Sequence, residues 1–174
     1  MTAIDKTPTN NNLLSPLGFK FSIKKLPMTN FFVQKAVIPG IFFSNTPEQP
    51  NPLVAIPHPG EQLTYDEFSI TFLIDEDMKN YKEIYDWMRG LGFPEYSRQY
   101  YELQHSEPGL GGGIKSDATL TILSNGKSPN ISIDIEDAFP VSLSNIELNV
   151  TDETVRYISA TAKFRYTLYN FSYL

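Results

Sequence analysis

Apolar and polar residues alternate with a period of two over much of the chain, a pattern typical of strands with one buried face. Phenylalanine and isoleucine alternate with lysine and serine over residues 17–26, which predicts a first strand. Residues 26–30 read as a turn and residues 31–38 as a second strand, so the two strands are expected to form a hairpin. A third strand is expected over residues 63–74. The N-terminal half is therefore predicted to be largely β.

The C-terminal third returns to the same alternation. Strands are expected over residues 119–123, 131–135, 141–150 and 155–171. The alternation slips by one residue at Ser144/Asn145, which predicts a β-bulge there. The fold class expected from the whole pattern is mainly β, with α+β character because one segment has a different period.

That segment is the only predicted helix, over about residues 76–90. Its apolar residues follow the i, i+3, i+4 spacing of a helix face. The stripe comprises Met78, Tyr81, Ile84, Tyr85 and Met88. The acids of residues 75–77 are interpreted as helix-start residues rather than a cation site, because helix N-termini favour negative charge. Trp87 lies off the stripe, where it either completes the core or marks an interface.

Three stretches are predicted to be irregular. Residues 44–60 contain five prolines, which lack the N–H donor that a sheet interior needs, so a long extended loop is expected. Loops of this length are usually functional or ordered by a partner, and a plain connector is the alternative. Residues 91–116, rich in glycine and tyrosine, are expected to be a second loop. Residues 1–15 are polar and predicted to be a flexible N-terminal extension, and residues 16–174 are predicted to form a single domain.

Composition narrows the functions available to such a domain. The 174 residues fit one domain with a sizeable core. The net charge is −6, but residues 1–35 carry five lysines and one acid, so the rest of the chain is strongly acidic. An acidic body is unsuited to tight binding of nucleic acid, which depends on neutralising phosphates. The chain has no cysteine, which excludes disulfides, zinc-thiolate sites and thiol nucleophiles.

We find no pattern that predicts catalysis, a cofactor or a metal site. The two histidines, His58 and His105, fall in separate predicted loops, too few for a multi-histidine metal centre. Glu136 and Asp137 are adjacent, so within a strand they would point to opposite faces rather than form a catalytic pair. The glycine-rich residues 109–116 resemble a phosphate-binding loop but lack the preceding strand and following helix. An enzyme is therefore not expected.

The edge strands of a sheet expose unpaired N–H and C=O groups that must be covered or paired. This requirement favours assembly of several copies of the chain. The final residues, 165–174, are aromatic and β-prone to the end, which would be an aggregation hazard if the strand were left unpaired. Pairing of edges between identical subunits yields rings or fibres.

At the level of motifs, the chain resembles the tail tube proteins of contractile-tailed, myovirus-type bacteriophages. The most specific stretch is residues 63–94, LTYDEFSITFLIDEDMKNYKEIYDWMRGLGFP. Supporting matches are PLGFKFSI from Pro16, VIPG from Val37, and the strand from Asp152 to Tyr169. The resemblance implies two packed antiparallel sheets forming a sandwich or barrel with one flanking helix. It further implies a structural virion protein whose hexameric rings stack into a tube with a lumen for DNA.

The resemblance also implies partners and a location. The partners would be other copies of the chain, the tail sheath, the baseplate and tail-terminator proteins, while DNA would pass through without specific binding. Neither a cofactor nor membrane insertion is implied, and the protein would be assembled in the host cytoplasm and end in the virion tail. Two alternatives stay open: a baseplate tube initiator of the same fold, and a small soluble β-barrel module that binds a ligand or glycan.

Three surfaces are candidates for these contacts. For contact with the next ring, a proline-stiffened loop loses less entropy on docking, and the candidates are Asn45, Glu48, Asn51, Val54, Ile56 and His58. For the lumen, acids would keep DNA from adhering, and the candidates are Asp134, Glu136, Asp137, Glu147, Asp152 and Glu153. For the sheath, the polar face of the helix offers Glu76, Lys79, Lys82, Glu83 and Asp86.

Overall fold

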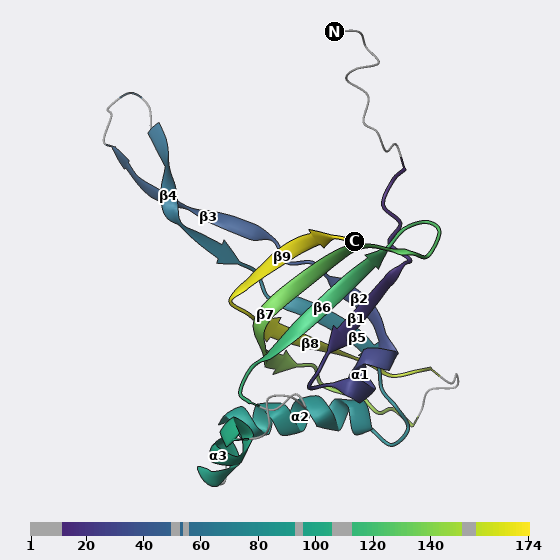
Figure 1. The fold of residues 1–174 in the computed structure, drawn as a ribbon. Coiled ribbons are helices and arrows are strands. Elements are labelled where there is room, and N and C mark those ends of the chain that lie inside the picture. The colour runs from purple at the N-terminus through teal and green to yellow at the C-terminus, as the bar shows by residue number, and fades with distance from the viewer. Residues whose placement is uncertain (1–11, 50–52, 54–55, 93–95, 106–112, 151–155) are drawn as a thin grey trace.

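Two layers of antiparallel strands carry a hairpin at one end and helices at the other (Figure 1). The computed structural model describes residues 12–49, 53, 56–92, 96–105, 113–150 and 156–174, with only the backbone described at 44–49 and 56–59. The prediction of a mainly β fold with two packed antiparallel sheets is confirmed. The described strands pack as a sandwich and do not close into a barrel.

The first layer consists of four antiparallel strands in the order β1-β6-β7-β9. They are β1 (Phe19–Ile23), β6 (Ser116–Leu123), β7 (Pro129–Leu143) and β9 (Leu168–Tyr173). The second layer continues from β7 through β8 and β5 to β2. Its further strands are β8 (Ser159–Arg165), β5 (Phe68–Leu73) and β2 (Val33–Val37). Since β7 pairs in both layers, the two layers are one seven-stranded sheet folded on itself.

The fold in β7 is made by a bulge. Ala118 of β6 pairs with Ile135 and Ser116 pairs with Ala138, so two residues of β6 span three of β7. Asp137 has φ of 60°, which departs from extended backbone and turns the strand. The bulge predicted at Ser144/Asn145 is therefore wrong in position, and residues 131–135 and 141–143 belong to one strand.

The side-chain orientations of Glu136 and Asp137 also differ from the prediction, because of the same bulge. An ideal strand would turn one of the two side chains into the core. Here both are exposed, because the bulge inserts an extra residue between the inward-facing Ile135 and Ala138.

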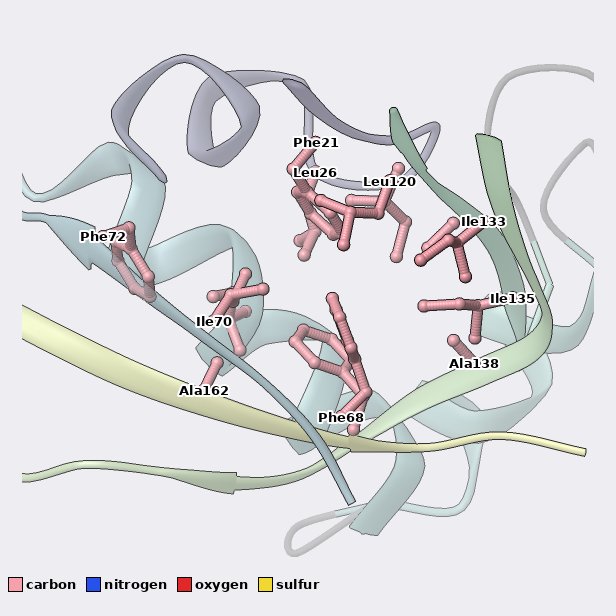
Figure 2. Packing of buried hydrophobic residues seen from close by; sticks show 14 of the residues in the cluster. Phe21, Leu26, Phe68, Ile70, Phe72, Leu120, Ile133, Ile135, Ala138 and Ala162 are labelled. Carbon is pink, nitrogen blue, oxygen red and sulfur yellow. The ribbon is translucent and has the colours of Figure 1, made fainter. Parts of the chain in front are cut away.

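The core lies between the layers, where large side chains face small ones. Phe68, Ile70 and Phe72 of β5 are almost fully buried, as the alternation predicted. Ala160 and Ala162 of β8 alternate with exposed residues and leave room for the rings. Figure 2 shows side chains of β5 and β8 pointing toward Leu120, Ile133 and Ile135 of the other layer.

Helix α2 (Lys79–Gly92) covers one end of the sandwich, and the predicted apolar stripe is confirmed in part, because Ile84 is buried and Tyr81 and Met88 pack against the core. Its buried residues are Asn80, Ile84 and Trp87, whereas Tyr85 is 49% exposed. Met78, expected on the stripe, precedes the helix with φ of 55°. Trp87 belongs to the core and its Nε1 donates to the Ile114 carbonyl at 3.0 Å, so the core interpretation is correct.

Two further helices replace predicted irregular or strand structure. Residues 27–32 form α1 (Pro27–Phe32), where a turn and the start of a strand were expected. Consequently β1 pairs with β6 and β2 with β5, and the predicted hairpin between β1 and β2 is wrong. Within the predicted loop 91–116, α3 (Arg98–His105) packs beside α2 and β6 begins at Ser116.

The proline-rich stretch is a β-hairpin, not a loop. Strands β3 (Ile41–Gln49) and β4 (Ile56–Tyr65) pair with each other and project from the sandwich (Figure 1). A two-stranded ribbon has a free edge on both strands, so prolines are tolerated where the missing N–H faces outward. The pairing register shifts between Phe43 and Asn45 and between Thr46 and Gln49. We call this hairpin the arm.

The long predicted strands are also divided. Residues 63–65 end β4, and β5 begins only at Phe68. The predicted strand 155–171 breaks after Arg165, so that β8 lies in the second layer and β9 in the first.

Asn80 joins α2 to the end of β5. Its side chain is fully buried, donates from Nδ2 to the Leu73 carbonyl at 2.6 Å and accepts from the Asp75 N–H at 3.3 Å. We expect Asn80→Ala to lower the free energy of unfolding by about 2 kcal/mol, because it leaves two buried backbone groups unpaired. Urea unfolding measures this change. Lys82→Ala, on the exposed side of α2, is the control and should stay within about 0.5 kcal/mol of wild type; equal effects of the two would contradict the role given to Asn80.

Candidate assembly surfaces

The outward side of the first layer is a polar face built from small hydrogen-bonding side chains. Ser22, Thr119, Asp134 and Asn170 are register partners in one row across all four strands. The neighbouring row is equally polar. It consists of Lys20, Thr121, Ser132 and Ser172. We call this surface, made of the outward residues of β1, β6, β7 and β9, the polar face.

The acids on this face are held by hydrogen bonds. The Asp134 carboxylate is half-buried and accepts from Thr119 Oγ1 at 3.1 Å and from Ser132 Oγ at 3.0 Å. Glu136 accepts from Asn170 Nδ2 at 3.2 Å. Since these partners keep the carboxylates close to the sheet, the polar face presents fixed acceptors among hydroxyl groups rather than a row of mobile charges.

The predicted lumen acids only partly come together. Asp134 and Glu136 share the polar face, and Asp137 sits beside them at the bulge, where Lys115 Nζ lies 3.2 Å from its carboxylate. Glu147 lies elsewhere, in the exposed segment after β7. Asp152 and Glu153 lie outside the described residues. Sequence reasoning missed the Ser and Thr side chains, although their alternation with apolar residues over 116–123 was a usable signal.

The residues predicted for contact with the next ring belong to the arm. Asn45 and Glu48 are in β3, and Ile56 and His58 are in β4. Their backbones are placed by the pairs Asn45↔Pro59, Thr46↔His58 and Gln49↔Ile56. Asn51 and Val54 lie outside the described residues.

The base of the arm is fastened by a cluster of three tyrosines that we call the arm joint. The rings of Tyr65, Tyr166 and Tyr169 have centroids 5.5–6.0 Å apart. The Tyr169 hydroxyl donates to the Pro39 carbonyl at 3.3 Å, and the Asp66 N–H donates to the Gly40 carbonyl at 3.0 Å. Both strands of the arm are thus tied to the corner where β8 gives way to β9.

A groove of about 650 Å³ opens next to the arm joint. Its lining runs from Leu63 and Tyr65 at the arm base to Lys163 and Arg165 of β8. Glu67 lies between the two cations, 3.4 Å from Lys163 Nζ and 3.7 Å from Arg165 Nε. The groove therefore combines an apolar side with a charged side.

The Tyr166 hydroxyl is an unusual feature of this groove. The oxygen is buried, and no partner for it is found among the described residues. Burial raises the pKa of the Tyr166 phenol well above its usual range, with smaller contributions from Tyr169, Tyr65 and Asp66. The phenol is thus a neutral donor in need of an acceptor.

Of the five residues predicted on the outer side of the helix, four are exposed, and contact with the sheath stays a prediction. Glu76, Lys79, Lys82 and Asp86 are exposed. Glu83 instead accepts from the backbone N–H groups of Met28 and Thr29, at 3.3 and 3.2 Å, and from Thr29 Oγ1 at 3.2 Å. It caps the start of α1, where a carboxylate is favoured by the unpaired N–H groups.

The described part of the chain contains neither a metal-binding cluster nor a membrane-spanning helix. Among the described residues, no cluster of three or more His, Asp or Glu side chains is arranged to hold a metal ion. No described helix is long and apolar enough to cross a membrane. The glycine-rich residues 109–112 lie outside the described part.

Comparison with known proteins gives concordant likenesses in sequence and in structure. Residues 9–172 match a family model described as phage tail tube protein. The tail tube terminator protein of Enterobacteria phage T4 is 28% identical over 164 residues, which cover 91% of this chain and 88% of that protein.

Two solved structures have the same fold. The tube terminating cap of the anti-feeding prophage has a TM-score of 0.62 with 12% identity, and each chain is covered completely. A chain of the sheath-tube complex of the PVC extracellular contractile injection system has a TM-score of 0.59 with 10% identity, again with complete coverage.

Two tyrosines of the arm joint provide a matched pair for a stability test. Tyr166→Phe should leave the unfolding free energy of the monomer within about 0.5 kcal/mol of wild type or raise it, because the hydroxyl has no partner to lose. Tyr169→Phe should lower it by about 1 kcal/mol, because the bond to the Pro39 carbonyl disappears. Urea unfolding of both variants measures the difference. A larger loss in Tyr166→Phe than in Tyr169→Phe would contradict these assignments.

Proposed function

Because the chain belongs to the phage tail tube protein family, we propose that it forms a ring that stacks on the end of a tail tube and terminates it. Membership in this family makes it a tail-related structural protein rather than an enzyme, as the sequence predicted. The observation that carries the proposal is the match to the phage T4 tail tube terminator along 91% of the chain.

The two unlike ends of the subunit support this role. The arm projects from one end of the sandwich, and α2 and α3 cover the other (Figure 1). A ring built from such subunits has two chemically different rims. One rim can bind the tube while the other meets a different partner, which is what termination requires. In this proposal the arm contacts the adjoining ring, and the exposed side of α2 faces the sheath.

The bore is assigned to the polar face. A wall of Ser, Thr and Asn side chains with hydrogen-bonded carboxylates offers DNA phosphates no cluster of cations to adhere to. Lys20 lies on β1, at the margin of this face, and Lys24 directly follows that strand; lysine at such an edge discourages unwanted pairing. DNA then passes through the ring without specific binding. Assembly in the host cytoplasm and incorporation into the virion tail follow from this role.

The second candidate is the main tube subunit, which the description of the matching family favours. The two roles differ in one respect: a main subunit adds to itself without limit, and a terminator does not.

Tube growth in vitro separates these roles. We expect the purified chain alone to give single-layer rings in negative-stain micrographs, and a substoichiometric amount to shorten tubes grown from the same phage's tube subunit. Long tubes formed by the chain alone would instead establish the main-subunit role. A monomer at every concentration, without effect on tube growth, would overturn both.

The arm provides the matched variant for that assay. Deletion of residues 51–58 should preserve the circular dichroism spectrum and abolish the shortening of tubes. The double variant Glu61→Ala/Gln62→Ala, at exposed positions of β4, is the control and should act as wild type.

The assignment of the bore is tested by charge reversal. Phage carrying Asp134→Lys and Glu136→Lys should eject DNA several-fold more slowly, because added cations hold phosphates. The paired variant Asp77→Lys and Glu102→Lys, at two exposed acids outside the polar face, is the control for an equal change of charge. Ejection followed by dye fluorescence at an unchanged rate in the first variant would place the polar face away from the DNA.

A further inference from the structure

The base of the arm exposes an apolar surface that nothing covers in the described monomer. Ile41 pairs with Tyr65 and Phe43 with Leu63, so these four side chains lie together on one side of the ribbon. Ile41, Phe43 and Leu63 are 51%, 54% and 43% exposed. Since an isolated two-stranded ribbon is only marginally stable in water, a contiguous apolar side of this kind indicates an interface.

This apolar surface continues into the groove beside the arm joint, because Leu63 and Tyr65 belong to both. Further along, Lys163 and Arg165 share the Glu67 carboxylate, and Asp66 also lines the groove. The side chains of Lys163 and Arg165 are 51% and 68% exposed, so their remaining N–H groups are open to a further carboxylate from another molecule. We call this whole surface the receptor side.

A segment with the complementary chemistry follows the end of β7 and passes the start of β8. The Ser144 N–H donates to the Thr161 carbonyl and the Thr161 N–H to Ser144 Oγ, both at 2.9 Å. Residues 145–150 then continue beyond the sheet without pairing as a strand. Leu148 and Val150 are 78% and 100% exposed, and Glu147 between them and the sheet is exposed as well.

The two surfaces lie on opposite flanks of the subunit. Lys163 and Arg165 are at the end of β8 that adjoins the arm, whereas residues 144–150 pass its start. Figure 1 shows the described residues that follow β7 leading to the side away from the arm. A single subunit therefore cannot bring its own segment to its own receptor side.

We propose that the segment Ile146–Val150 of one copy seats on the receptor side of the next copy. Leu148 and Val150 cover the apolar base of the arm, and Glu147 joins the site of Lys163 and Arg165. The contact joins two different patches, so it is heterologous and generates a ring where the rotation closes. It rests on the proposed ring-forming function and specifies which surfaces make the ring.

Cysteine cross-linking tests this contact cleanly, because the natural chain contains no cysteine. We expect Leu63→Cys/Leu148→Cys, treated with a short bis-maleimide under ring-forming conditions, to give a ladder of covalent dimers, trimers and larger species up to the closed ring. The control Leu63→Cys/Lys127→Cys, with the second thiol in the β6–β7 turn, should give no ladder. Each single-cysteine variant should also give none.

Charge exchange provides an independent readout in the same assembly. Glu147→Lys should raise the concentration needed for half-maximal ring formation roughly tenfold, because it places like charges together. Adding Arg165→Glu should restore most of the loss. Glu102→Lys, an equal charge change on α3, should have no effect.

The outcomes distinguish this contact from the ring itself. Rings in negative stain without a Leu63–Leu148 ladder would overturn the contact and leave the proposed function standing. Absence of rings from the wild-type chain would overturn the proposed function. If the control Leu63→Cys/Lys127→Cys gave as strong a ladder as Leu63→Cys/Leu148→Cys, the cross-link would be unspecific. That result would also overturn the contact.

Discussion

The rest of the structure depends on strand β7 being shared by two layers. Its first part pairs with β6 and β9, and its last part pairs with β8. The bulge at Asp137 lets one continuous strand make both sets of hydrogen bonds, because it bends the backbone without ending the strand. Without that bend the apolar sides of β5 and β6 would not face each other, and the sandwich would lack a core.

The same bend distributes the surfaces of the subunit. On one side it turns Asp134 and the neighbouring hydroxyl groups outward as the polar face. On the other side it brings β8 to the corner where Tyr166 and Tyr169 hold the arm. The polar face needs no partner, since its side chains already bond to one another. The arm base and the segment after β7 are both apolar and exposed, so these are the surfaces that we expect to bind another copy of the chain.

Strands and helices could be predicted where apolar and polar residues alternate regularly along the chain. Strands β1, β5 and β8 each have one fully buried face, so their period of two was visible in the sequence. Helix α2 was predicted with Tyr81, Ile84 and Met88 correctly toward the core, whereas Met78 and Tyr85 were wrongly included, because apolar character alone does not distinguish an exposed side chain from a buried one. The arm was missed because proline is read as a breaker, while a ribbon with two free edges tolerates it. Among site residues, Glu83 was misplaced because its polar character says nothing about the helix start it caps.

The sequence by itself determined a mainly β fold and the absence of cysteine, together with a family resemblance that the comparisons confirmed. These properties follow from residue type and local period, which a single chain displays directly. Only the tertiary structure decided which strands pair, where β7 bends, and that Lys163 and Ile146–Val150 lie on opposite flanks. These relations join residues that are distant along the chain. The local pattern allows several strand pairings, and long-range packing selects among them.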